Sequence, residues 1–451
     1  MKKTKPIELF YPGLDESPYY RIPSLVRLKS GDIIAGADQR QTTESDYGGA
    51  IEPVIRIKES GKDDFSDIRT VFKNPSKNFD SPTYTIDMSI IGSALDDDRV
   101  YMLIDKFKSA GNYGASKKGS GYIKRDGKYY LLLFEHKVNS LLFNKQENRF
   151  YLKDGKVYTL DYLKTDYTVK VDPPYPYDGL GDLYEGNELI GNIYSDLSPI
   201  QVHQRPYLWF TYSDDNGKTF NCPVDITSEV VRDDMMFLGT CPGRGLQLKS
   251  GRLIFPVYYT VENPDDIYQN KEKTSLIYSD DFGKTWSMSN SPSDLTKEKH
   301  IDTSESQLVE LSDGRLIMFS RTTADRLVYA ISLDKGESFS GSLHFVEFES
   351  EPFCMVSAVR FIKDNKDYIL ISNPSGPGRT NGSIKVLEVV ADELKLLAQK
   401  EINQTHFTYS VIEKLNKESE FALVYEEKRE FQAELRENIL YMEFDLEWLL
   451  S

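Results

Sequence analysis

Residues 279–286 read Ser-Asp-Asp-Phe-Gly-Lys-Thr-Trp, one of three copies of the pattern Ser-x-Asp-x-Gly-x-Ser/Thr-aromatic. The other copies, here called turn boxes like the first, begin at Ser213 and Ser332, and each copy follows an apolar, β-branched run. Asp can bond to the backbone two residues further on, and Gly takes the positive φ of a tight turn. We expect the closing aromatic ring to pack under the turn. Three copies therefore predict repeated β-hairpin units.

A second repeat accompanies the turn boxes. Residues 25–34, 246–254 and 308–317 each alternate like a strand, turn at a Gly and leave as an apolar run. The last two copies each come after a turn box, so the repeating unit is two hairpins, or four antiparallel strands. Radial repetition of four-stranded sheets predicts an all-β chain folded as a β-propeller.

Neither repeat occurs between residues 109 and 205. That segment contains strand-like runs at 129–134 and 155–160 and a proline-rich turn at 173–176. Its Tyr, Val and Thr content and its prolines favour strands over helices. We therefore predict a propeller domain over 1–108 and 206–451, interrupted in one blade by a β-rich insertion domain over 109–205.

Composition excludes several classes of function. The net charge of −16 argues against a nucleic-acid partner. The three cysteines and five histidines lack metal-ligand spacing, so neither a metal site nor a disulfide framework is expected. The sequence has no run of about 18 apolar residues, so we expect no membrane span. The first residues lack the apolar stretch of a signal peptide. We expect a cytoplasmic protein or a part of a secreted or cell-surface one, with a monomer favoured.

Counting outward from turns places charged residues opposite one another at the open ends of three hairpins. The predicted pairs are Arg21 with Arg40, Glu305 with Arg321, and Tyr409 with Glu426. In a propeller, equivalent ends of successive blades converge near the axis. The sequence therefore predicts a charge-rich funnel on one face. A single ion pair at a hairpin end is usually a solvated surface pair, so the prediction rests on the geometry that the three hairpins share.

At this point the chain resembles the bacterial sialidases. Residues 20–23, Tyr-Arg-Ile-Pro, are similar to the Arg-Ile-Pro motif of that family, and the turn boxes resemble its Asp boxes. Matching motifs follow in order at 303–306, 319–321, 376–382 and 407–410. The segment 109–205 resembles the insertion of the large streptococcal-type sialidases. The resemblance implies a six-bladed propeller.

The resemblance also implies a role for each matching residue. Arg21, Arg321 and Arg379 would hold the carboxylate of sialic acid, because guanidinium groups bind carboxylates through forked hydrogen bonds. Glu426 would support Arg21. Tyr409 would be the nucleophile and Glu305 its base, since a phenol near pKa 10 is mostly unreactive at neutral pH.

The remaining site residues are implied in the same way. Asp46 would be the acid/base that protonates the leaving oxygen and later activates water. Four residues would line the other substituents of the sugar: Asp38, Arg40, Asp87 and Tyr258. No cofactor and no metal are implied.

The resemblance implies an exo-sialidase that releases terminal α-linked sialic acid from sialylated glycans through a covalent tyrosyl intermediate. Two alternatives stay open. One is an intramolecular trans-sialidase or an elimination-type enzyme, which would give an anhydro or unsaturated sialic acid. The other is a non-catalytic propeller that binds sialoglycans, although a pure binder needs no base–nucleophile pair. A glycosidase for neutral sugars would leave three arginines unexplained.

Overall fold

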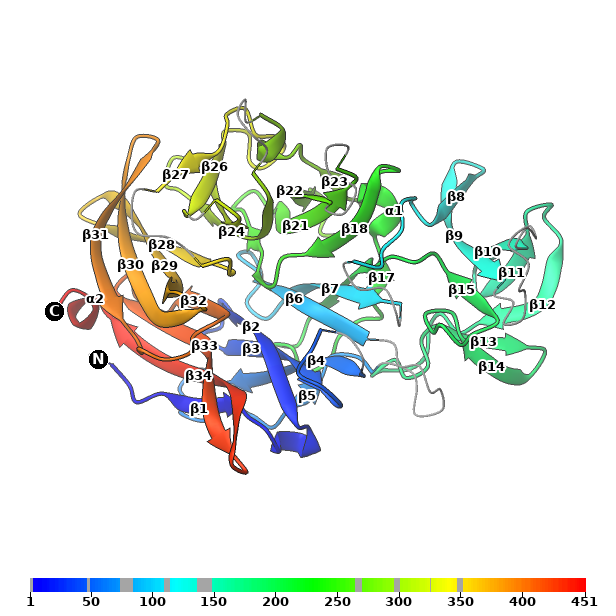
Figure 1. Cartoon of the computed structure of the whole chain (residues 1–451), viewed down its shortest axis with the longest axis horizontal. Helices are drawn as coiled ribbons and strands as arrows, with labels where there is room; N and C mark the ends of the chain where they lie inside the picture. The colour runs from blue at the N-terminus through cyan, green and yellow to red at the C-terminus, as the bar shows by residue number, and fades with distance from the viewer. Residues whose placement is uncertain are drawn as a thin grey trace.

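The computed structural model describes residues 3–46, 49–73, 84–108, 114–135, 148–263, 270–295, 301–324, 326–346 and 352–451. Its regular structure is almost entirely β, with two one-turn helices, α1 (Thr227–Val230) and α2 (Leu446–Leu449). Figure 1 shows sheets arranged around a centre and a second β-rich lobe to their right. No helix in the described ranges has the length and apolar character needed to cross a membrane.

Six antiparallel blades follow one another around the centre, which confirms the predicted six-bladed propeller. The first two blades are β2 (Tyr19–Arg27), β3 (Ile33–Arg40), β4 (Ile51–Lys58) and β5 (Arg69–Thr70), then β6 (Tyr84–Gly92), β7 (Val100–Phe107), β16 (Tyr207–Ser213) and β17 (Val224–Asp225). The next two are β18 (Met235–Thr240), β20 (Leu246–Gln247), β21 (Leu253–Val261), β22 (Lys271–Ser279) and β23 (Ser287–Met288), then β24 (Thr303–Glu310), β25 (Leu316–Thr322), β26 (Val328–Ser332) and β27 (His344–Phe345). The last two are β28 (Ser357–Lys363), β29 (Lys366–Gly376), β30 (Thr380–Val390) and β31 (Glu393–Glu401), then β32 (Ser410–Lys414), β33 (Glu420–Phe431), β34 (Glu434–Asp445) and β1 (Ile7–Phe10).

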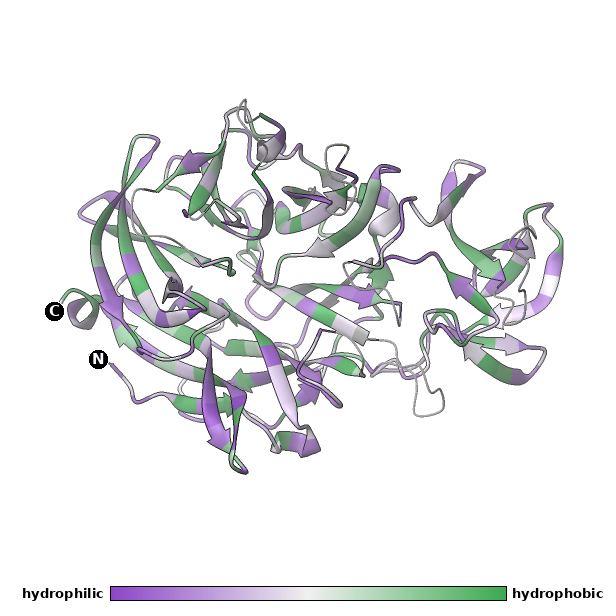
Figure 2. Cartoon of the chain, viewed as in Figure 1, coloured by the Kyte–Doolittle hydropathy of each residue, from purple (hydrophilic) through white to green (hydrophobic). Residues whose placement is uncertain are grey.

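The ring is closed by strands from opposite ends of the chain. The early strand β1 pairs antiparallel with β34 and so supplies the outer strand of the sixth blade. Along many strands, hydrophobic and hydrophilic residues alternate in bands (Figure 2). This period of two buries one set of side chains between neighbouring blades.

The three turn boxes share one hydrogen-bond pattern. In the box at 279–286, Asp281 accepts hydrogen bonds from Ser279 Oγ at 2.8 Å, from the Thr285 amide at 2.9 Å and from Thr285 Oγ1 at 2.7 Å. The boxes at Ser213 and Ser332 repeat these contacts. The predicted positive φ of the glycine is confirmed, at 90° for Gly283. The expected reach of the Asp is wrong: Asp281 accepts from the amides of Lys284 and Thr285, three and four residues further on, and not from the amide two residues on.

Removing the central carboxylate of a turn box should destabilise its blade. Asp281→Ala deprives Ser279 Oγ and both Thr285 donors of their acceptor, so we expect a loss of about 1–3 kcal/mol in the free energy of unfolding. Chemical denaturation measures this loss. Lys284→Ala, on an exposed side chain of the same turn, is the matched control. Equal stabilities of the two variants would contradict the assigned role of Asp281.

A separate sheet stands between β7 and β16 in the chain, and we call it the insertion sheet. Its strands are β8 (Tyr122–Arg125), β9 (Lys128–Glu135), β10 (Arg149–Lys153), β11 (Lys156–Thr159), β12 (Lys164–Val169), β13 (Asp182–Glu185), β14 (Glu188–Asn192) and β15 (Ile200–Val202). It forms the right-hand lobe of Figure 1. The domain boundaries 1–108, 109–205 and 206–451 stay a prediction, and residues 109–113 and 136–147 lie outside the described part of the chain.

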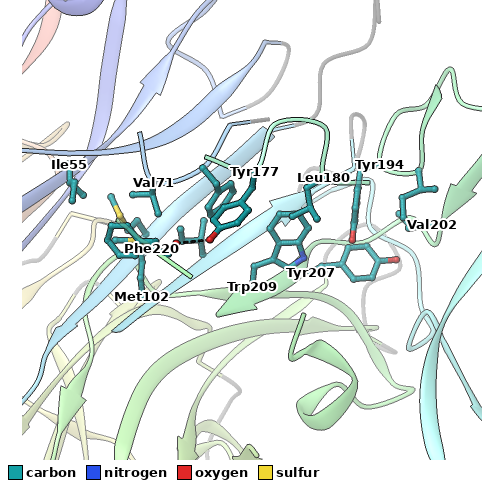
Figure 3. Packing of buried hydrophobic residues seen from close by; sticks show 14 of the residues in the cluster. Ile55, Val71, Met102, Tyr177, Leu180, Tyr194, Val202, Tyr207, Trp209 and Phe220 are labelled. Atoms are coloured by element: carbon teal, nitrogen blue, oxygen red, sulfur yellow. Dashed lines mark hydrogen bonds between the residues drawn. The ribbon is translucent and has the colours of Figure 1, made fainter. Parts of the chain in front are cut away.

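One apolar core joins the insertion sheet to the propeller. Tyr177 and Tyr194 pack beside Trp209 and Phe220 of the second blade, and all are at most 8% exposed (Figure 3). The Tyr177 hydroxyl donates to the Phe220 carbonyl at 2.6 Å. Buried aromatic pairs of this kind add to the free energy of area burial. The lobe is therefore held against the second blade by a continuous core.

Candidate active site

A cavity of about 470 Å³ opens where the blades converge, and residues of five blades line it. Its described lining is Ile22, Asp46, Ile86, Asp87, Phe107, Gly114, Phe237, Tyr258, Glu272, Ser304, Glu305, Arg321 and Tyr409. Six residues singled out from the sequence are among them: Asp46, Asp87, Tyr258, Glu305, Arg321 and Tyr409. The predicted convergence of hairpin ends is therefore present.

Tyr409, Glu305 and Arg321 are in direct contact at one wall of this cavity. The Tyr409 hydroxyl donates to Glu305 Oε1 at 2.6 Å. Arg321 Nη1 lies 2.8 Å from Glu305 Oε2 and 3.1 Å from the Tyr409 oxygen. The phenolic oxygen therefore has a proton acceptor on one side and a fixed cation on the other.

Burial sets the charge state of the phenol. Burial, followed by the nearby Glu305 carboxylate, raises the pKa of Tyr409 well above its ordinary value, and Arg321 opposes this shift. Tyr409 consequently keeps its proton in the resting site. Glu305 is the only described group within hydrogen-bond reach of the phenol that can accept it.

Two of the three predicted hairpin pairs are confirmed, and one is wrong. Glu305 meets Arg321, and the Glu426 amide donates to the Tyr409 carbonyl at 2.9 Å. Arg21, however, lies opposite Asp38, while Arg40 lies opposite Tyr19. The turn lies slightly earlier in the chain than the predicted pairing of Arg21 with Arg40 requires. A β-bulge between Arg21 and Ser24 shifts the partner of Arg21 further toward the turn. An acid rather than a second arginine therefore lies opposite Arg21.

Glu426 fixes Arg21 in place. Its two oxygens accept from Arg21 Nε at 2.8 Å and from Arg21 Nη2 at 3.2 Å. The amides of Ile22 and Tyr409 donate to the same carboxylate at 2.7 and 3.1 Å, and the Thr408 hydroxyl also bonds to it. Burial would raise the pKa of Glu426, but Arg21 and these donors hold it below its usual value. Glu426 is therefore a permanent anion that orients one guanidinium.

Arg379 completes a ring of three arginines around Tyr409. It lies in the turn between β29 and β30 with a φ of 61°, and its Nη2 donates to the Phe353 carbonyl at 2.7 Å. The guanidinium carbons of Arg379 and Arg21 each lie 5.7 Å from the centre of the Tyr409 ring. Within the described ranges, Arg379 has no carboxylate partner. An incoming anion can therefore be shared by all three arginines.

Arg40 joins two acids on the first blade. Its Nη2 atom lies 3.1 Å from Asp38 Oδ2 and 2.8 Å from Asp46 Oδ1. Arg40 and Asp38 are fully buried, whereas the Asp46 side chain is 61% exposed at the mouth of the cavity. Burial raises the pKa of Asp38 to about 7, against the opposing effect of Arg40. Arg40 therefore positions the exposed carboxylate from beneath.

The sequence analysis missed Asp105, which is buried beneath the cavity. It lies on β7 two residues before the lining residue Phe107, and it accepts from the Thr240 amide at 2.8 Å. Burial raises the pKa of Asp105 and of the lining residue Asp87 well above the usual carboxyl range. The only signal in the sequence was the position of this acid directly after the apolar run 100–104.

Glu437, behind the arginines, should make stability depend on pH. It is 4% exposed, lies 3.3 Å from His406 Nε2, and burial together with Glu426 raises its pKa to about 8. The folded state therefore binds this proton more tightly than the unfolded state, and stability falls as pH rises from about 4 to about 8. Glu437→Gln cannot ionise, so its melting temperature should rise relative to the parent protein between pH 5 and pH 9.

Thermal unfolding at pH 5, 7 and 9 measures this effect. Glu434→Gln, on a neighbouring side chain that is 64% exposed, is the matched control. A pH-independent difference between Glu437→Gln and the parent protein would contradict the assigned protonation.

Comparisons with known proteins agree with this geometry. A model of a BNR repeat-like domain matches residues 187–406. The chain is 28% identical over 422 residues to the anhydrosialidase of Macrobdella decora, covering 83% of this chain and 52% of that protein. It is 26% identical over 421 residues to sialidase B of Streptococcus pneumoniae, covering 85% and 58%. Over most of its length, this chain is therefore similar to sialidases.

Solved structures support the same fold for this chain. The leech intramolecular trans-sialidase, in complex with 2,7-anhydro-Neu5Ac, has a TM-score of 0.81 at 22% identity and covers 99% of this chain and 71% of that one. The Ruminococcus gnavus intramolecular trans-sialidase, in complex with oseltamivir carboxylate, has a TM-score of 0.80 at 24% identity and covers 98% of both chains. At these identities the likeness concerns the fold. The chain spans 52% and 58% of the length of the two curated relatives named above.

Proposed function

We propose that this chain is an exo-acting glycosidase that releases terminal α-linked sialic acid from sialylated glycans. The contact of the Tyr409 hydroxyl with Glu305 at 2.6 Å, beside Arg321, carries the proposal. A protein that only binds sialic acid needs the arginines but has no use for a base on a buried phenol. The similarity of the chain to an anhydrosialidase and to a sialidase supports the same class of activity.

In the proposed complex, Arg21, Arg321 and Arg379 hold the carboxylate of the sugar. Three guanidinium groups near one phenol repel one another. Glu426 pairs with Arg21 and Glu305 with Arg321, but Arg379 has no acidic partner among the described residues. The carboxylate supplies the missing negative charge through forked hydrogen bonds. It also places the anomeric carbon, to which it is attached, next to Tyr409.

The first chemical step transfers the sugar to Tyr409. The phenolic oxygen bonds to the anomeric carbon while its proton passes to Glu305, and the glycosidic bond breaks as Asp46 gives its proton to the leaving oxygen. A neutral nucleophile suits an anomeric centre that already carries a carboxylate, because a second carboxylate would approach against repulsion. Asp87 and Tyr258 line the part of the cavity left for the other substituents.

In the second step Asp46 accepts the proton of the attacking hydroxyl, the bond to Tyr409 breaks, and Glu305 returns the proton to the phenol. If the attacking group is water, the product is free sialic acid. If it is a hydroxyl of the sugar itself, the product is an anhydro sugar. The second outcome is favoured by the 28% identity to an anhydrosialidase across 83% of this chain. Loss of a proton from the sugar instead would give an unsaturated product.

Incubation with α2,3- and α2,6-sialyllactose in water enriched in heavy oxygen tests the proposal. Free sialic acid carrying the heavy isotope establishes hydrolysis. A released sugar lighter by one water and free of the isotope establishes internal attack or elimination, which nuclear magnetic resonance separates by the double bond. No release from either substrate would overturn the proposal in favour of a sialoglycan-binding propeller.

A further inference from the structure

The insertion sheet has one face in the core and one face outside it. Leu133, Phe150, Val157 and Val169 belong to the buried core shared with the propeller. Side chains alternate along a strand, so the neighbours of these residues lie on the opposite face. The register pairs Tyr151 with Tyr158 and Lys153 with Lys156, and all four share that outer face.

Tyrosine rings form an ordered group on the outer face. The Tyr151 ring stacks on Tyr158 at 5.4 Å between centroids, and Tyr130 and Tyr162 pack against Tyr151 at 5.5 and 6.4 Å. Tyr162 is 55% exposed, whereas Tyr151, at the centre of the group, is only 4% exposed. Tyrosine offers large contact area at low cost in conformational entropy, with a polar hydroxyl at its edge. The group is thus held in place and partly open to solvent.

Cations surround these rings without acidic partners. Lys153 and Lys156 are exposed, and neither makes an ion pair with any described residue. Arg125 lies over Tyr162 at 4.5 Å and over Tyr151 at 5.8 Å, and its Nη2 donates only to the Leu160 carbonyl. Lys153 lies 5.8 Å from the centre of the Tyr130 ring. The nearby acids Asp154 and Asp166 come within ion-pair distance of none of these cations.

This local charge is opposite to that of the whole chain, whose net charge is −16. An anionic polymer is repelled by most of the surface, and repulsion is screened beyond about 10 Å. A cluster of unpaired cations can therefore attract such a polymer locally. Rings that are flanked by cations can stack on sugar rings and bind their carboxylates together.

We infer that this face binds a sialylated glycan chain at a second site, remote from the catalytic cavity. The glycan-binding face consists of Arg125, Tyr130, Lys153, Lys156 and Tyr162, and the buried Tyr151 ring supports them from below. Carboxylated sugars match both its cations and its rings, and the choice of sialic acid among them rests on the proposed function. Holding one part of a glycan at the insertion sheet raises the effective concentration of neighbouring termini at the cavity.

Binding to immobilised polysialic acid tests this inference in the Tyr409→Phe background, which leaves the polymer intact. Lys153→Ala/Lys156→Ala and Tyr162→Ala should each weaken binding about tenfold, because each removes part of a multivalent contact. Lys249→Ala/Lys395→Ala removes the same charge from exposed, unpaired propeller lysines and should leave binding unchanged. Thermal unfolding verifies that all variants are folded.

Kinetics with otherwise unmodified protein separate this site from the cavity. All three variants should retain kcat/KM on 3′-sialyllactose, whereas the two glycan-face variants should act more slowly on a polysialylated protein. Unchanged polymer binding in both glycan-face variants would overturn the inference. So would equal loss in the propeller control, tighter binding to chondroitin sulfate, or a dimer in light scattering that the face variants abolish. Failure of the parent protein to cleave 3′-sialyllactose would instead count against the proposed function alone.

Discussion

Tyr409→Phe is expected to lower turnover on the order of 10⁴-fold or more while sialic acid still binds. The substitution removes only the hydroxyl that contacts Glu305 at 2.6 Å and Arg321 at 3.1 Å. The three arginines that would hold the carboxylate keep their places, because Arg21 is fixed by Glu426 and Arg379 by the Phe353 carbonyl. Steady-state kinetics with 3′-sialyllactose and calorimetric binding of sialic acid measure the two effects separately.

Tyr425→Phe is the matched control for this change. Tyr425 lies on β33 opposite Ser410, is 2% exposed and stacks on Phe407 in a different core cluster. The Tyr425→Phe variant loses the same hydroxyl close to the site. Because Tyr425 does not line the cavity, this variant should keep full activity. Turnover by Tyr409→Phe at the parent rate would refute Tyr409 as the nucleophile. Loss of sialic acid binding in that variant would show that the phenol holds the substrate instead.

Arg321→Lys is expected to lower kcat/KM by about 10²–10³-fold, with KM rising and kcat falling together. Arg321 would bind the carboxylate of the sugar, and it also contacts both the base and the nucleophile. A lysine keeps the charge but cannot form the fork, and its ammonium cannot span Glu305, Tyr409 and a substrate at once. Both ground-state binding and the attack should therefore suffer.

Arg315→Lys controls for the substitution itself. Arg315 lies at the far end of the same hairpin, where it pairs with Asp313 and Asp392 at the surface. Exposed pairs of this kind contribute about 1 kcal/mol or less, so activity should be unchanged. Parent-like kinetics of Arg321→Lys would place Arg321 outside the carboxylate clamp.

The propeller could be predicted from the sequence because its signals are local. Each turn box makes its defining hydrogen bonds within eight residues, as between Ser279, Asp281 and Thr285. The hairpins at 25–34, 246–254 and 308–317 are likewise present where the repeats predict them. For the pair formed by Glu305 and Arg321, one hairpin suffices to bring the residues together.

Other features escaped prediction because they depend on irregular register or on burial. The position of the turn and a β-bulge between Arg21 and Ser24 together placed Arg21 opposite Asp38 rather than Arg40, and simple counting from the turn does not include a bulge. Asp105 lies on an apolar strand where only packing of the neighbouring blade decides whether its carboxylate is buried. The raised pKa of Glu437 follows from its burial and from the nearby Glu426 carboxylate, and neither can be read from the residues next to Glu437 in the sequence.

By itself, the sequence determined the repeating β unit, the order of the blades and the chemical types available to a site, because these follow from contacts over a few residues. Only the tertiary structure decided which residues of different blades meet. Arg21 and Glu426 are separated by 405 positions and Glu305 and Tyr409 by 104, and closing the ring of blades brings each pair within hydrogen-bond distance. Their charge states were decided in the same way, since burial and neighbouring charges exist only once the blades have packed.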